Sequence, residues 1–152
     1  MTRLTNLQKL YDIDDLQWLE ETIFLLKKQQ FNQLDLEHLI EELEDLGKDK
    51  KNAAASLLEQ IIRHLLLLQY WQAEAPYNQI HWQGEIYTFR TQLKRKLTTN
   101  LRQYLASERD SIYQDALGFV QIKTQNSLNF PPECPYSLEQ LLDVQWLPQQ
   151  KD

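Results

Sequence analysis

The chain has 152 residues and a formal net charge of −6 at pH 7, a length that suits one domain. It holds few glycines and prolines, and its abundant Leu, Gln, Glu and Lys favour helices over strands. A single cysteine, Cys134, excludes an internal disulfide and indicates a reducing compartment. Net negative charge disfavours non-specific binding to nucleic acid.

Two further observations concern location. The first residues contain no long apolar run, so no secretory signal is indicated. The most apolar stretch, residues 57–71, is interrupted by charged and polar side chains, and it is too short to cross a bilayer. We therefore expect a soluble, cytoplasmic, all-α protein whose single helical-bundle domain covers residues 1–152.

The first predicted helix follows a lead-in over residues 1–10, which we expect to be loose. Asp14 or Asp15 is expected to cap it, because an aspartate accepts hydrogen bonds from free amides at a helix start. The helix is expected to end at residues 27–28, where the helix dipole favours lysines, and residues 31–33 form a turn. Its apolar face, at helical spacing, comprises Leu16, Trp18, Leu19, Ile23, Leu25 and Leu26.

The second predicted helix is long and begins after Asp35, a good N-terminal cap. Its apolar stripe continues in phase on both sides of Gly47, which predicts one long helix with room for a bend at that glycine. We expect the whole stripe to be buried. Before the glycine it consists of Leu36, Leu39, Ile40, Leu43 and Leu46, and after it of Ala53, Ala54, Leu57, Leu58, Ile61, Leu65 and Leu68.

Two more long helices and a short one complete the prediction. Because residues 75–78 interrupt the pattern, the third helix is expected to start between Gln79 and Gly84, and Thr99 is expected to cap the fourth. After a proline-rich loop over residues 126–136, a short helix follows, with Ser137 as its cap and Trp146 docking beyond it. The fold class is an up-and-down bundle of four main helices with a long second helix and a short C-terminal helix.

Several stretches of the chain carry a resemblance to a known family. They are LDLEHLIEELEDLG, RHLLLLQYW, SIYQDAL and FPPECPY. Through them the sequence resembles the domain-of-unknown-function family twenty-nine, which is found mostly in cyanobacteria, over nearly its whole length. The resemblance implies an all-helical bundle and brings no activity with it. The family often has Ser-Pro-Ser before the fourth helix, where this chain has Thr98-Thr99-Asn100.

An acidic cluster with a histidine lies on the second predicted helix, at spacings that place its members on neighbouring faces. Carboxylates and histidine are typical ligands of divalent metals, although the chain lacks the Glu-x-x-His motif of di-iron bundles. The alternative, which we favour, is a solvated acidic face near a helix N-terminus, with His64 as a core histidine. The candidate ligands of a metal-dependent enzyme are His38, Glu41, Glu42, Glu44, Asp45 and His64.

A basic stretch covers residues 90–109, which hold six basic residues against Glu108. Its members fall on shared faces of the predicted helices, so contact with a nucleic-acid backbone is one hypothesis. The alternative is pairing with the acidic second helix or simple solvation, which the net charge of −6 favours. The candidates for nucleic-acid contact are Arg90, Lys94, Arg95 and Arg102.

Neither a glycine-rich phosphate loop, a zinc cysteine pair nor a nucleophile elbow is found in the sequence. We therefore predict a non-enzymatic protein–protein interaction module without a cofactor, either binding a partner protein or forming a homo-oligomer. A metal-dependent enzyme and a nucleic-acid-contacting regulator are the alternatives. Aromatic side chains are enriched in interface hot spots, and the interface candidates are Tyr77, Trp82 and Trp146.

Overall fold

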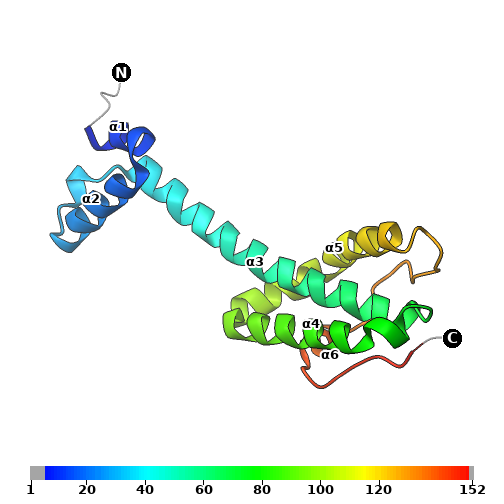
Figure 1. Cartoon of the computed structure of the whole chain (residues 1–152). Coiled ribbons are helices and arrows are strands. Elements are labelled where there is room, and N and C mark those ends of the chain that lie inside the picture. Colours follow the sequence, from blue (N-terminus) through cyan, green and yellow to red (C-terminus); the bar gives the residue numbers. More distant parts are fainter. Residues whose placement is uncertain (1–5, 151–152) are drawn as a thin grey trace. The chain divides into compact units, whose positions relative to one another are not determined.

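The computed structural model describes residues 6–150, and its regular structure there is entirely helical (Figure 1). The predicted all-α class is therefore confirmed. The elements are α1 (Asn6–Ile13), α2 (Asp15–Lys27), the 3-10 helix η1 (Phe31–Gln33), α3 (Leu36–Tyr70), α4 (Ala75–Lys96), α5 (Thr99–Lys123) and α6 (Leu138–Leu142).

The chain divides into two compact units, residues 1–49 and residues 50–152, which we call the N-terminal unit and the C-terminal unit. Helix α3 contributes its first turns to one and its remaining turns to the other. The four predicted main helices correspond to α2, α3, α4 and α5, but α2 belongs to a different unit from α4 and α5. The finer prediction of one four-helix bundle over a single domain stays a prediction.

Helix caps explain several boundaries. The Asp14 carboxylate accepts a hydrogen bond from the Gln17 amide at 3.0 Å, so the predicted cap of α2 is confirmed. Ser137 caps α6 through a reciprocal capping box with Gln140. Thr98, and not Thr99, caps α5 by accepting from the Leu101 amide, so that prediction was wrong by one residue.

Two other boundaries differ from the prediction. Residues 6–10 belong to α1 and not to a loose lead-in, because Leu7 buries itself against the N-terminal unit; residues 1–5 lie outside the described part. Helix α4 begins at Ala75 and includes Pro76 in its first turn. A proline is tolerated there because its missing N–H has no helical partner to lose, so the apparent break was the start of the helix.

Helix α3 runs without interruption through Gly47, as the in-phase apolar stripe predicted. A Cβ built at this glycine meets no atom within 4 Å. The glycine is thus not required by close packing, and the helix accepts it at a cost of about 1 kcal/mol relative to alanine.

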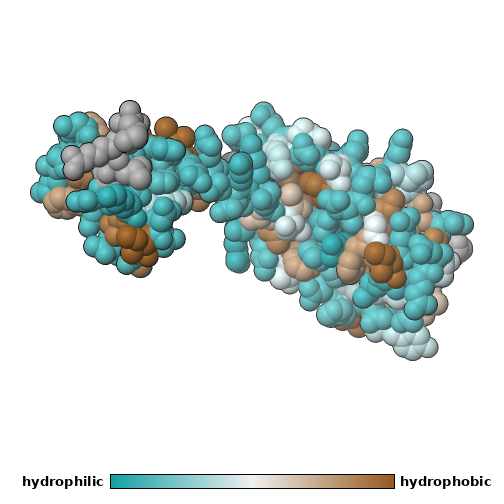
Figure 2. Space-filling model, turned by 90° about the horizontal axis from the view of Figure 1, so that it is seen from above, coloured by the Kyte–Doolittle hydropathy of each residue, from teal (hydrophilic) through white to brown (hydrophobic). Residues whose placement is uncertain are grey.

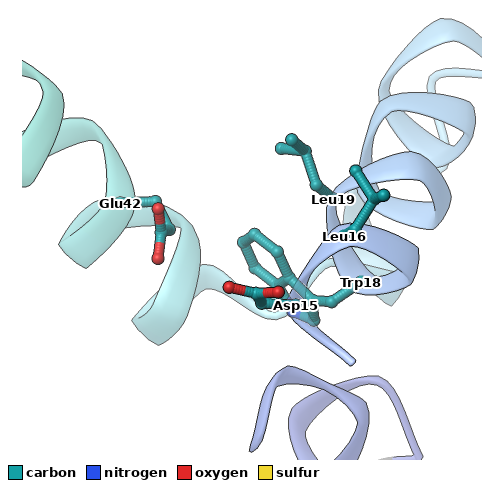
Figure 3. Close-up of a pocket in the computed structure, with 5 residues that line it drawn as sticks. All are labelled: Asp15, Leu16, Trp18, Leu19 and Glu42. Atoms are coloured by element: carbon teal, nitrogen blue, oxygen red, sulfur yellow. The ribbon is translucent and has the colours of Figure 1, made fainter. Parts of the chain in front are cut away.

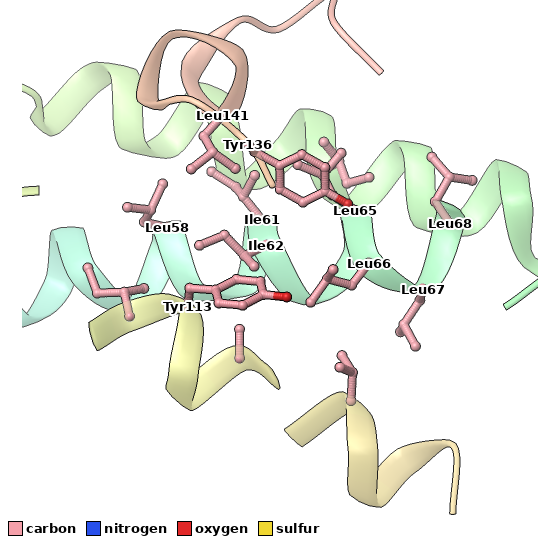
Figure 4. Packing of buried hydrophobic residues seen from close by; sticks show 14 of the residues in the cluster. Leu58, Ile61, Ile62, Leu65, Leu66, Leu67, Leu68, Tyr113, Tyr136 and Leu141 are labelled. Carbon is pink, nitrogen blue, oxygen red and sulfur yellow. The ribbon is translucent and has the colours of Figure 1, made fainter. Parts of the chain in front are cut away.

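The core of the C-terminal unit is apolar and continuous (Figure 4). The C-terminal half of α3 provides its largest share, since five successive positions from Leu65 to Gln69 are buried. Helices α4 and α5 cover this segment with Trp82, Ile86, Leu93, Leu105 and Val120. Tyr136 and Leu141 from the chain after α5 close the cluster, as Figure 4 shows.

Arg90 anchors α6 and the segment that follows it. It is 2% exposed, and its guanidinium donates to three backbone carbonyls, those of Gln140, Leu141 and Trp146, at 2.6 to 2.9 Å. Burial lowers the pKa of Arg90 to about 10, which leaves it charged at neutral pH. The predicted docking of Trp146 is confirmed, because its ring also packs edge-on against Tyr136 at 5.7 Å between centroids.

Within residues 6–150, no helix combines the length and the apolar composition needed to cross a membrane.

Candidate interaction surface

A network of polar and aromatic side chains organises the N-terminal unit. The Trp18 indole Nε1–H donates to the Asp35 carboxylate at 3.1 Å, and His38 Nδ1 lies 2.5 Å from the same carboxylate oxygen. The Tyr11 ring stacks on the His38 ring with 3.9 Å between centroids, and its hydroxyl donates to Glu42 at 2.6 Å. One buried carboxylate therefore joins α2 to the start of α3. The Tyr11 ring joins α1 to both, since it also meets the Trp18 ring edge-on at 5.1 Å between centroids.

Electrostatics supports this arrangement. The hydrogen bond to Asp35 raises the pKa of His38, although partial burial acts in the opposite direction. The hydrogen bond to Glu42 raises the pKa of Tyr11 to about 12. The imidazole is therefore stabilised in its protonated form beside a buried carboxylate, and the phenol stays neutral at physiological pH.

Few apolar side chains are buried in this unit. Among its described residues the buried ones are Leu7, Trp18, Thr22 and Asp35. Most of its large apolar side chains are instead exposed to solvent. They include nine on α2 and the first three turns of α3, all between 39% and 62% exposed: Leu16, Leu19, Ile23, Phe24, Leu26, Leu36, Ile40, Leu43 and Leu46. We call these nine residues the N-terminal apolar surface.

The spacing of these residues shows that they form stripes. On each helix the leucines and isoleucines recur every three or four positions, so they share one face. Figure 2 shows such apolar side chains, in brown, at the surface of the N-terminal unit among hydrophilic ones. The expectation that Leu36, Ile40, Leu43 and Leu46 are buried was wrong, because these side chains are between 52% and 59% exposed.

A hollow of about 190 Å³ lies beside these stripes, between α2 and α3. Leu16 and Leu19 approach it from α2 and Glu42 from α3, with Asp15 and Trp18 completing its lining (Figure 3). It is small and open, so it extends the surface and does not form a separate ligand site.

The N-terminal unit is also strongly acidic. Residues 6–49 hold twelve acidic against four basic residues, a net charge of −8, whereas residues 50–150 hold nine acidic against ten basic residues, a net charge of +1. Several acids directly follow stripe residues, as Glu37 follows Leu36 and Glu44 follows Leu43. The apolar surface is therefore bordered by exposed carboxylates.

The residues predicted as metal ligands do not converge. His38 and Glu42 are engaged with Asp35 and Tyr11, while Glu41, Glu44 and Asp45 are exposed. His64 belongs to the C-terminal unit, where its Nδ1 contacts the Gln60 carbonyl. Across residues 6–150, no group of three or more His, Cys, Asp or Glu side chains is placed to hold a metal ion.

The four residues predicted for nucleic-acid contact differ in how far they are exposed to solvent. Arg90 is buried against backbone carbonyls and has no surface to offer a phosphate. Lys94 and Arg95 are exposed on the last turn of α4. Arg102 is half-exposed, and its guanidinium lies 3.7 Å from the Glu139 carboxylate. The charge pattern of the sequence gave no indication that Arg90, unlike the other three candidates, would be buried.

The three aromatic interface candidates also differ. Tyr77 is 84% exposed and keeps its place as a candidate. Trp82 is 5% exposed and stacks on Trp71, so it serves the core of the C-terminal unit. Trp146 is half-buried on Tyr136. The N-terminal apolar surface was missed as a site because most of its residues were assigned to the apolar faces of bundle helices.

The described residues therefore define a small all-α protein with an exposed, apolar and acidic surface in its N-terminal unit. Comparison with known families identifies the family. The model described as "Domain of unknown function DUF29" matches residues 10–147, and the chain belongs to this family. Searches of the curated proteins and of the solved structures found no match.

Proposed function

We propose that this protein is a non-enzymatic interaction module whose N-terminal apolar surface binds an amphipathic helix of a partner protein. The observation that carries the proposal is the exposure of nine large apolar side chains on two neighbouring segments of one small unit. Soluble proteins rarely leave so many large apolar groups in water unless a partner covers them. Stripes at helical spacing are typical of helix-in-groove recognition.

Charge indicates which partner fits. The N-terminal unit carries −8 over residues 6–49, with carboxylates next to the apolar stripes. A partner helix with lysines or arginines beside its apolar face satisfies these carboxylates and is attracted over a distance of about 10 Å at ordinary ionic strength. Two copies meeting face to face instead bring two acidic borders together, so we favour a basic partner over self-association.

The energetic gain is adequate for binding. Complete burial of a leucine or isoleucine contributes about 1.5–3 kcal/mol, so a half-exposed one has about 1 kcal/mol left to gain. Nine such side chains offer enough to offset the cost of ordering a helical partner and still leave useful affinity.

The proposal is tested with two synthetic helical peptides that share one leucine pattern, one with lysine and one with glutamate on the polar positions. Calorimetric titration of the full chain is expected to show saturable binding of the lysine peptide and none of the glutamate peptide. Leu43→Glu and Ile23→Glu are each expected to abolish the binding, because they place a charge inside the apolar surface. Ile80→Glu, at an 88% exposed site on α4, is the matched control and should bind as the unaltered chain does.

Two results contradict the proposal. One is equal binding of the lysine peptide by the Leu43→Glu variant, which places the contact elsewhere. The other is a dimer in sedimentation that Leu43→Glu dissociates, which assigns the surface to a second copy of the chain.

A further inference from the structure

A cleft of about 360 Å³ lies in the C-terminal unit between α3, α4 and α5, and it is separate from the N-terminal apolar surface. Its volume falls in the range of roughly 300–1,000 Å³ typical of small-molecule sites. Its lining combines flat aromatic surfaces, from Trp71, Trp82 and Phe119, with a high proportion of nitrogen-bearing side chains. The polar lining residues are Gln60, Arg63, His64, Glu74, Asn78, His81 and Lys123.

The charged groups of the cleft are predominantly basic. Arg63 and Lys123 carry fixed positive charges and two histidines lie beside them, whereas Glu74 is the one carboxylate in the lining. Glu74 is itself engaged, because the Asn78 side chain donates to it at 3.2 Å. Within the lining itself, two permanent cations therefore face one carboxylate, and two further carboxylates act from just outside it, Glu59 on Arg63 and Glu85 on His64.

Arg63 has an unused donor. One terminal nitrogen of its guanidinium is 2.6 Å from the Glu59 carboxylate, and the guanidinium carbon lies 3.9 Å from the centre of the Phe119 ring. Its Nε, however, is buried and has no hydrogen-bond partner among the residues the structure describes. A buried N–H without an acceptor is costly, and the side chain that carries it also lines the cleft.

His64 complements this donor with an acceptor. Its Nδ1 lies 2.7 Å from the Gln60 carbonyl oxygen, which only accepts, so Nδ1 carries the proton in the neutral ring and Nε2 keeps a lone pair. Burial lowers the pKa of His64 and outweighs the opposing effects of the hydrogen bond with Gln60 and of the Glu85 carboxylate. The ring is therefore neutral at physiological pH, with the cationic Lys123 also in the lining.

From this arrangement we infer that the cleft binds a small oxyanion of the phosphate or carboxylate class. The exposed Lys123 attracts the anion at the entrance, where the exposed His81 offers a ring nitrogen as a hydrogen-bond partner. Arg63 offers a charged guanidinium inside the cleft, and His64 accepts from a ligand O–H such as that of hydrogen phosphate. The inference concerns a different unit from the proposed protein interaction and does not rest on it.

The test is calorimetric titration of the full chain with inorganic phosphate and, separately, with acetate, at low ionic strength in a non-coordinating buffer. Tryptophan fluorescence gives a second readout, because Trp71 and Trp82 line the cleft. We expect saturable binding with a dissociation constant in the millimolar range or tighter. Stronger binding of phosphate assigns a phosphate-bearing ligand, and stronger binding of acetate assigns a carboxylate.

Substitutions locate the binding. Lys123→Gln is expected to weaken it by about tenfold, since one charge-assisted hydrogen bond is lost, and His81→Asn to weaken it less. Lys96→Gln, at an exposed position outside the cleft, is the matched control and should leave binding unchanged. Both cleft positions are exposed, so helical circular dichroism is expected to be unaltered. If neither anion binds, or if Lys123→Gln and His81→Asn bind like the unaltered chain, the inference is overturned.

Discussion

The two halves of helix α3 carry one apolar stripe, but its side chains are exposed in the first half and buried in the second. Leu36, Ile40 and Leu43 are 57%, 53% and 59% exposed. The residues 18 positions later, which is five full turns at 3.6 residues per turn, are Ala54, Leu58 and Ile61, all 0% exposed. The same face of the same helix is thus solvated in one unit and fully buried in the other. Periodicity identifies the apolar face of a helix, and the neighbouring elements decide whether that face becomes core or binding surface.

The largest expected effect compares two isoleucines of this stripe. Ile61→Ala is expected to reduce the free energy of unfolding by about 3 kcal/mol, because it removes buried methyl groups and leaves a cavity. Ile40→Ala, at a half-exposed position, should change it by less than about 0.5 kcal/mol. Urea denaturation of both variants measures the difference. A comparable loss in Ile40→Ala means that the first half of the stripe is packed in solution, and the contrast between the units then fails.

The next effect examines how the C-terminal unit is closed. Arg90→Leu removes donors from three backbone carbonyls, and we expect a loss of about 2 kcal/mol, in line with hydrogen bonds to a charged group. Residues 137–147 should also become sensitive to proteolysis. Lys94→Gln, one turn further along α4 and exposed, is the control. Unaltered stability and protease resistance in Arg90→Leu exclude this anchoring role.

A smaller effect is expected in the N-terminal unit, where a polar network replaces an apolar core. Trp18→Phe keeps most of the aromatic bulk but deletes the Nε1–H that donates to the buried Asp35. We expect this to cost about 1 kcal/mol and to increase amide hydrogen exchange in α1 and α2 while α4 and α5 stay protected. Uniformly faster exchange along the chain indicates that the units unfold together and contradicts the contrast drawn between them.

The smallest effect is a pH dependence of the same network. Because Asp35 raises the pKa of His38, protonation of this ring stabilises the folded unit. The stabilisation is fully present below the ordinary histidine pKa of about 6.5 and is lost as the pH rises through the raised value in the folded state. Thermal unfolding followed by fluorescence should therefore show the N-terminal unit weakening between near-neutral and alkaline pH. His38→Gln is expected to flatten this dependence, and an unchanged profile in that variant assigns it to another group.

Much of the fold was predictable because local chemistry decides helix ends and phases. Asp14 and Ser137 are residue types that favour N-terminal caps, so the starts of α2 and α6 could be predicted. The apolar stripe on both sides of Gly47 predicted an unbroken α3. The start of α4 was misjudged because Pro76 suits a first helical turn as well as a break.

The candidate surface was less accessible to prediction, since exposure depends on contacts between distant segments. The sequence showed the charge segregation and the apolar stripes. It held no sign that Leu36 and Leu43 lack a covering helix, while Leu58 and Leu65 have several. Burial of Arg90 was equally hidden, because its acceptors are backbone carbonyls that any residue supplies.

The anchoring of the segment after α5 also has a consequence for folding during synthesis. Tyr136 donates to Gln69 across 67 positions of the chain, and Arg90 reaches carbonyls 50 to 56 positions ahead of it. The buried stripe of α3 therefore leaves the ribosome well before the residues that complete its cover. Until then the nascent chain exposes an apolar helix of the kind that chaperones recognise and that promotes aggregation. Docking of this segment through its backbone can therefore occur only after α3 has been synthesised, and it depends on the buried Arg90.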